Sequence, residues 1–144
     1  MRWRAEALLA WTEGLLQKTG ADLPSARAVA WALVEAEMRG VSSHGLLRLP
    51  VYLRRLEAGL IHPSPTLPAA VRGPVALLDG EHGFGPRVAL RAVELAQTLA
   101  RAHGLGAVAV RRSTHFGMAG YYAEKLAQEG LLALVTTNAE PDVV

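Results

Sequence analysis

Four prolines lie close together near the middle of the chain and separate two different sequence patterns. They are Pro63, Pro65, Pro68 and Pro74. Because proline lacks a backbone N–H and fixes its own φ angle, such a run suits neither a helix nor a central strand. We therefore predict a loop or an edge segment at residues 62–74. We take this segment as the main internal boundary, between residues 1–62 and 63–144.

The part before this boundary has the spacing of helices. Apolar residues recur at three- and four-residue steps from Trp3 to Leu16, and Gly20 is a suitable end for this first helix. Asp22 can act as an N-cap, and Pro24 suits the first turn of a second helix that extends to about residue 40. We expect these two helices to form an antiparallel pair.

A third helical stretch is predicted from Ser43, as its cap, to Gly59, which ends it. Pro50 lies inside this stretch. Either the helix begins near Pro50 or its first turns are bent, because proline disrupts the interior of a helix.

The part after the boundary alternates between strand and helix patterns. Short apolar runs predict a strand at 75–78, a buried strand at 107–110 and a third strand suited to buried sheet positions at 131–137. Helices are predicted at 86–103 and 118–128, which Gly104 and Gly130 follow. The chain is therefore expected to be a mixed α/β protein, with an N-terminal helical segment followed by a βαβαβ arrangement.

Composition excludes several classes of protein. The 144 residues suffice for one hydrophobic core, and 15 basic against 13 acidic residues leave a net charge of +2 that does not favour nucleic-acid binding. The absence of cysteine excludes a disulfide framework and a thiolate metal site. Apolar runs are too short for a membrane span, and charged residues interrupt the N-terminal segment, so we expect a cytoplasmic protein without a secretory signal.

A glycine pair, Gly83 and Gly85, opens the predicted helix at 86–103 and invites a nucleotide-binding interpretation. The third glycine of the dinucleotide motif is replaced by Val88, and Arg111 and Arg112 stand where an acidic residue would be needed. A plain structural turn is therefore the favoured interpretation.

The most specific pattern combines His44 with Arg48, four residues later. At helical spacing the two side chains share one face, where imidazolium can protonate a carbonyl oxygen and guanidinium can hold a carboxylate. Reduction of a 2-oxo acid needs this combination. From residue types alone a structural alternative is favoured, in which Ser43 caps a helix, His44 is a surface or capping residue and Arg48 is a solvated charge.

His115 is the second candidate, because it lies between a predicted strand and a predicted helix, where loops often bind ligands. Equally, Ser113 or Thr114 could cap that helix while His115 fills a polar gap. The histidines do not have the spacing of metal ligands and no carboxylate accompanies them, so a metal site is not favoured. The histidines in question are His44, His62, His82 and His115.

These motifs together resemble the malate/L-lactate dehydrogenase family of the non-Rossmann type. The resemblance runs in order through Arg39-Gly40, Ser43-His44-Gly45, Arg48-Leu49, Tyr52, Arg55, Gly59-Leu60-Ile61, Gly83-Phe84-Gly85, the segment from His115 to Ala123, and Asn138. It implies an NAD- or NADP-dependent oxidoreductase that acts on a small 2-hydroxy or 2-oxo acid, such as malate or lactate. It also implies a homodimer with the cofactor in a cleft between domains.

The resemblance assigns roles to individual residues. His44 is the proton donor, Ser43 is its hydrogen-bonding partner and Arg48 binds the substrate carboxylate. The residues that would line the nicotinamide cofactor are His115, Phe116, Gly117, Met118 and Ala119.

Members of this family are much longer than 144 residues, which leaves two hypotheses open. The chain is either the N-terminal part of a working dehydrogenase or a truncated, inactive module that folds and self-associates. A binder of acidic ligands or nucleic acid that uses the arginines is a weaker third hypothesis.

Overall fold

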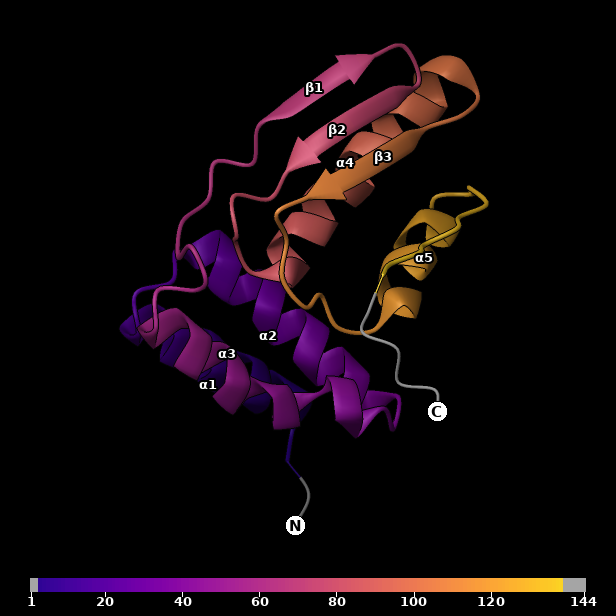
Figure 1. Ribbon diagram of the computed structural model, residues 1–144. Coiled ribbons are helices and arrows are strands. Elements are labelled where there is room, and N and C mark those ends of the chain that lie inside the picture. The colour runs from indigo at the N-terminus through magenta and orange to yellow at the C-terminus, as the bar shows by residue number, and fades with distance from the viewer. Residues whose placement is uncertain (1–2, 139–144) are drawn as a thin grey trace, which may run out of the picture.

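The computed structural model describes residues 3–138, in which helices pack below and beside a small sheet (Figure 1). The elements, in chain order, are α1 (Ala5–Lys18), α2 (Leu23–Met38), the 3₁₀ turns η1 (Ser42–His44) and η2 (Leu46–Arg48), α3 (Leu49–Glu57), β1 (Ala69–Arg72), β2 (Val75–Asp79), α4 (Gly85–His103), β3 (Ala107–Arg111) and α5 (Ala119–Gln128). The prediction of a mixed α/β chain with helices first is confirmed.

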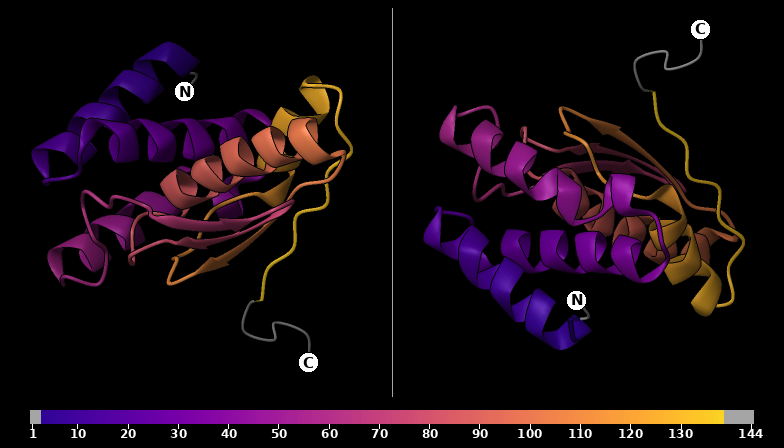
Figure 2. Two further views of the ribbon diagram at one scale, coloured as in Figure 1. Left: turned by 90° about the horizontal axis from the view of Figure 1, so that it is seen from above. Right: turned by 90° about the horizontal axis from the view of Figure 1, so that it is seen from below.

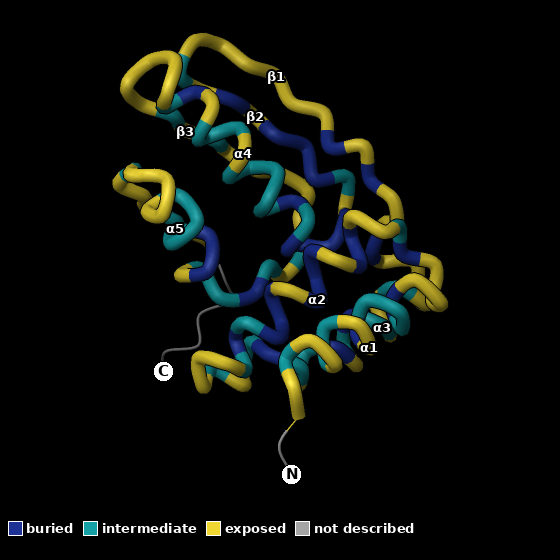
Figure 3. Tube along the Cα trace, turned by 180° about the vertical axis from the view of Figure 1, so that it is seen from behind, coloured by how far each residue is buried: buried dark blue, intermediate teal, exposed yellow. Residues whose placement is uncertain are grey.

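Helix α2 is the centre of the molecule, and it is buried along most of its length (Figure 3). The carboxylate of Asp22 accepts a hydrogen bond from the backbone N–H of Ser25 at 2.8 Å, so the predicted N-cap is confirmed. Many α2 residues are alanines, whose small side chains let α1, α4 and α5 approach closely. Leu16 of α1 and Leu33 of α2 are fully buried in the shared core.

The third helical stretch is broken, as Pro50 suggested. Two 3₁₀ turns precede α3, and Pro50 lies in the first turn of α3, where a missing N–H removes no helical hydrogen bond. The prediction that Ser43 caps a helix is wrong, because its side chain makes no capping bond. Its hydroxyl instead lies 3.0 Å from Nδ1 of His44.

The sheet has the strand order β1-β2-β3, with β1 antiparallel and β3 parallel to β2. Helix α4 crosses from β2 to β3 and covers one face, where Leu78 and Val88 are fully buried. The proline-rich segment therefore contains an edge strand, β1, which agrees with its prediction as a loop or an edge segment. Among the described residues no helix covers the opposite face of the sheet (Figure 2), and Val75 and Leu77 are exposed there.

Two strand predictions need correction. The strand at 107–110 forms, as β3, but it is largely exposed rather than buried. Residues 131–137 form no strand, and Leu132 and Leu134 are fully exposed. A strand is stable only when a neighbour satisfies its backbone groups and another layer covers its side chains. Within the described part of the chain residues 131–138 pair with no strand, and only Val135 among them packs against a buried cluster.

No helix in residues 3–138 is both long enough and apolar enough to cross a membrane.

Candidate active site

The candidate site forms where α3 meets the segment that follows β3. The buried Tyr52 of α3 connects them, because its hydroxyl lies 2.7 Å from Nδ1 of His115 and donates to the His115 carbonyl oxygen at 3.2 Å. Burial raises the pKa of the Tyr52 phenol well above its ordinary value, so this group stays a neutral hydroxyl. Tyr52 thus fixes the position of one predicted site residue.

The glycine turn at residues 83–85 holds the His115 segment from the other side. Thr114 accepts a hydrogen bond from the backbone N–H of Gly85 at 2.9 Å and donates to the carbonyl oxygen of Gly83 at 3.0 Å. A side chain at Gly85 would overlap the backbone of Thr114 and His115. The first N–H of α4 is therefore satisfied within the chain, and the turn joins α4 to the His115 segment.

The structure brings the two predicted histidines together from opposite sides of the proline-rich segment. The ring centroids of His44 and His115 are 5.6 Å apart. Ser43 lies beside His44, with its hydroxyl 3.0 Å from Nδ1. Among the described residues Nε2 of His44 has no such partner.

Glu37 positions the turns that carry His44, although the sequence pattern gave it no role. Its carboxylate accepts hydrogen bonds from the backbone N–H of Leu46 at 2.8 Å and from the hydroxyl of Ser42 at 3.0 Å. A side chain at Gly45 would overlap this carboxylate. The signal that could have found Glu37 is the glycine that directly follows His44, because glycine often marks a close approach of two segments.

Arg48 lines a pocket of about 240 Å³ next to these turns. Its Nε donates to the carbonyl oxygen of Ser43 at 2.7 Å, which orients the guanidinium. The residues that line the pocket are Arg48, Val51, Tyr52, Arg55, Ile61, Thr114 and His115. The pocket therefore contains two of the predicted residues, Arg48 and His115, while His44 lies beside His115 outside the lining set.

The pocket is positively charged. Partial burial and the nearby charges of Arg48 and His44 lower the pKa of His115 below its ordinary value. Neither Arg48 nor Arg55 forms an ion pair with a carboxylate of residues 3–138. Arg55 has no role in the sequence prediction, although its spacing from Arg48 places both on one helix face. An anionic ligand suits such a site.

The rest of the predicted cofactor segment is partly or fully buried and does not line this pocket. Phe116 stacks on Tyr122 with a centroid distance of 5.4 Å, and Met118 packs into the same cluster. Gly117 is buried and has a φ of 85°, a conformation that favours glycine. Tyr121 and Tyr122 are both buried. In the described residues, His115 is thus the member of this segment that lines the pocket.

Other histidines do not join the site. Nδ1 of His62 accepts a hydrogen bond from the backbone N–H of Ser64 at 3.2 Å, and the backbone N–H of His62 donates to the carbonyl oxygen of His82 at 2.9 Å. In the part of the chain that the structure describes, no group of three or more histidines and carboxylates is arranged to hold a metal ion.

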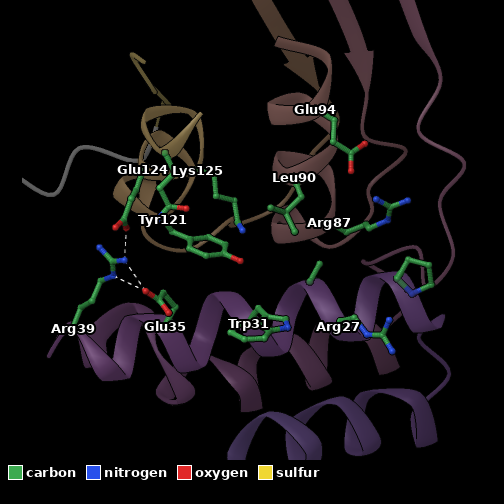
Figure 4. A pocket seen from close by; sticks show the side chains of 13 residues that line it. Arg27, Trp31, Glu35, Arg39, Arg87, Leu90, Glu94, Tyr121, Glu124 and Lys125 are labelled. Atoms are coloured by element: carbon green, nitrogen blue, oxygen red, sulfur yellow. Dashed lines mark hydrogen bonds and ion pairs between the residues drawn. The ribbon is translucent and has the colours of Figure 1, made fainter. Parts of the chain in front are cut away.

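A second, larger pocket of about 410 Å³ lies between α2, α4 and α5 (Figure 4). Arg39 closes one end through ion pairs with Glu35 and Glu124, and Trp31 and Tyr121 form part of the wall. It shares no residue with the pocket at Arg48 and contains none of the predicted site residues. The smaller pocket is therefore the candidate active site.

Comparison with known proteins points to one family. The family model described as malate/L-lactate dehydrogenase matches residues 3–144. The chain is 41% identical over 137 residues to a malate dehydrogenase of Pyrococcus abyssi, covering 94% of this chain and 38% of the relative. It is 42% identical over 124 residues to a (2R)-3-sulfolactate dehydrogenase (NADP(+)) of Chromohalobacter salexigens, covering 86% of this chain and 37% of the relative.

The fold agrees with this result. The structure of malate dehydrogenase from Pyrococcus horikoshii matches with a TM-score of 0.87 and 38% identity, covering 90% of this chain and 38% of that structure. The chain thus spans a little over a third of the length of the relatives that it matches.

Proposed function

The chain belongs to the malate/L-lactate dehydrogenase family, and we propose that it supplies the acid–base and substrate-binding residues for interconversion of a small 2-hydroxy acid and its 2-oxo acid. The observation that carries the proposal is the convergence of His44 and His115 beside the pocket that Arg48 lines. Two imidazoles and a guanidinium at one place suit an acid with a carbonyl next to its carboxylate. Malate and sulfolactate, which name two of the relatives, have this chemistry after oxidation.

In the proposed reaction, Arg48 binds the substrate carboxylate. Its Nε is already bonded to the backbone of Ser43, so the two terminal nitrogens remain for the ligand. A guanidinium can donate two parallel hydrogen bonds to a carboxylate, which fixes the orientation of the adjoining carbonyl group. Binding at Arg48 therefore determines where the reacting carbon lies.

His44 is the proposed proton donor to the carbonyl oxygen. The Ser43 hydroxyl next to Nδ1 orients the ring, which leaves Nε2 to face the substrate. In the reverse direction the neutral imidazole accepts the proton from the hydroxyl group. His115, held by Tyr52, lies on the pocket wall and contributes a second polar contact to the substrate.

The proposal includes NAD or NADP, which supplies or accepts the hydride when bound. The described residues fit this group in part: His115 lines the pocket, whereas Phe116 and Met118 are partly buried and the backbone N–H of Gly85 is already bonded to Thr114.

The test compares substrate binding and turnover in matched variants. His44→Ala should reduce turnover by orders of magnitude in an active preparation while the affinity for oxamate, an inert carboxylate, changes little. His103→Ala, in the last turn of α4 and away from the site, is the control. Turnover that is the same in both variants would remove His44 from the mechanism, and oxamate binding that survives Arg48→Gln would remove the carboxylate role of Arg48.

A second candidate function is a folded module without activity of its own that self-associates. The exposed apolar residues of the open sheet face and of residues 131–135 favour it, because exposed apolar patches often mark interfaces. A homodimer, as proposed for the family, would cover such a surface. A well-folded chain that binds neither oxamate nor NADH but forms dimers in light scattering would support this alternative.

A further inference from the structure

Arg55 lines the same pocket as Arg48 and His115, yet nothing in the proposed reaction uses it. Arg48 immediately precedes α3 and Arg55 lies in its last turn, seven positions later. Seven residues make about two helical turns, so both arginines lie on one face of the helix. Tyr52, between them in sequence, is the residue that holds His115.

The pocket between the two arginines has no counter-charge of its own. None of its seven lining residues is acidic, and neither guanidinium forms an ion pair with a carboxylate of the described residues. The exposed side chain of Arg55 makes no hydrogen bond to another described residue, in contrast to Arg39, Arg101 and Arg112, which are paired. Two guanidinium groups without a carboxylate partner among the described residues therefore line one small pocket, and such a pair suits an anion of two charges.

The remaining walls of the pocket decide how such an anion would lie. Val51 and Ile61 are apolar, and the Tyr52 hydroxyl is already bonded to His115. A carbon chain with an acidic group at each end would therefore place the groups at the arginines and its carbons against the apolar wall. A monocarboxylic acid would satisfy Arg48 alone and leave Arg55 in water.

We infer that Arg55 binds the second acidic group of the substrate and thereby makes the site selective for 2-hydroxy acids with two acidic groups over those with one. This inference rests on the proposed function, in which Arg48 binds the carboxylate next to the reacting carbon. The planar guanidinium group of Arg55 can donate two parallel hydrogen bonds to either a carboxylate or a sulfonate. Selectivity then depends on a charge at the far end of the substrate, away from His44.

The test uses L-malate and L-lactate, which share the 2-hydroxy acid group and differ in the second carboxylate. Their binding to the 144-residue chain is measured by calorimetry at one fixed salt concentration. Arg55→Gln should weaken malate binding about tenfold or more and change lactate binding less than about twofold, since it removes one charged hydrogen-bonding partner. Arg54→Gln, an exposed arginine of α3 outside the pocket, is the matched control and should change neither.

The outcomes separate this inference from the function on which it rests. Equal malate affinities in Arg55→Gln and Arg54→Gln would overturn the inference about Arg55. A parallel loss of malate and lactate binding in Arg55→Gln would also overturn it, because it would indicate a general effect of the lost positive charge. If Arg48→Gln abolishes binding of both acids while Arg55→Gln changes neither, the proposed function stands and this inference falls. A wild-type chain that binds neither acid overturns both, provided that circular dichroism shows it folded.

Discussion

The hydroxyl of Tyr52 lies 2.7 Å from Nδ1 of His115, and this contact joins the helical part of the chain to the segment that follows the sheet. Tyr52 is buried in the core with Phe84, and its ring also lies near the His115 ring. A site residue on a loop is thus fixed by a core residue on a helix. The stability of the fold and the geometry of the site are therefore connected at this point.

Removing the Tyr52 hydroxyl should lower the stability of the fold and loosen the position of His115. We expect Tyr52→Phe to lower the free energy of unfolding by about 1 kcal/mol, because the ring still fills the core while a hydrogen bond is lost. Urea unfolding measures this change. A double-mutant cycle with His115→Phe checks the cause, since independent effects of the two substitutions would contradict a direct interaction.

Gly85 should tolerate no side chain. In Gly85→Ala the new methyl group overlaps the backbone of Thr114 and His115, so the segment must move, at a cost of about 1–3 kcal/mol in unfolding free energy. Gly120→Ala is the control, because Gly120 lies in α5 with no atom within 4 Å of a new Cβ. That variant should be neutral or slightly stabilising. Equal thermal midpoints for the two variants would argue against the close approach at Gly85.

Glu37 should matter for the site as well as for the fold. Glu37→Ala removes the acceptor for the N–H of Leu46 and for the hydroxyl of Ser42, and we expect a loss of about 1–3 kcal/mol in stability. The turns that carry His44 and Arg48 should also become less ordered, which NMR relaxation of their backbone amides would show. Glu57→Ala, at the exposed end of α3, should change neither measurement.

Stability should depend on pH through His115. Because its pKa is lowered in the folded protein, the unfolded chain binds this proton more tightly than the native state does. The free energy of unfolding should therefore fall as the pH drops from about 7.5 to about 5.5, through the ordinary histidine pKa of about 6.5. His115→Gln should flatten this dependence in urea titrations. An unchanged slope in that variant would assign the effect to other groups.

The open face of the sheet should drive self-association of the chain. Leu77→Thr places a hydroxyl on that face and introduces a β-branched residue suited to a strand, so light scattering should show fewer dimers. Leu105→Thr is the control, because Leu105 is also an exposed leucine but precedes β3 and lies outside the sheet. Dissociation of both variants alike would point to non-specific association.

Most helices and two of the three strands could be predicted from the sequence, since their patterns are local. Asp22 with Pro24 and the turn at Gly104 give the ends of α2 and α4. The strand β1 was anticipated as an edge segment without being assigned as a strand, because four prolines obscure its pattern. The division of the chain at residues 62–74 into two parts stays a prediction.

The residues of the candidate site could be predicted from the sequence, but which of them line the pocket could not. His44, Arg48 and His115 were identified from their motifs, and the structure brings them to one place. Phe116 and Met118 were expected at a cofactor, and in the structure both are partly buried against the cluster of Tyr121 and Tyr122. Their roles toward a cofactor stay predictions.

The sequence by itself determined the ends of α2 and α4 and the turn at residues 83–85, because each depends on neighbours within a few positions. The acid–base and anion-binding roles of His44 and Arg48 stay predictions. Only the tertiary structure decided that His44 and His115 lie side by side, since α2, α3 and the turn at Gly85 must pack before the two segments meet. It also decided that residues 131–137 form no strand here, because β propensity has no effect without a partner strand to satisfy the backbone. Local chemistry is encoded by local sequence, whereas proximity between distant residues depends on the packing of the whole chain.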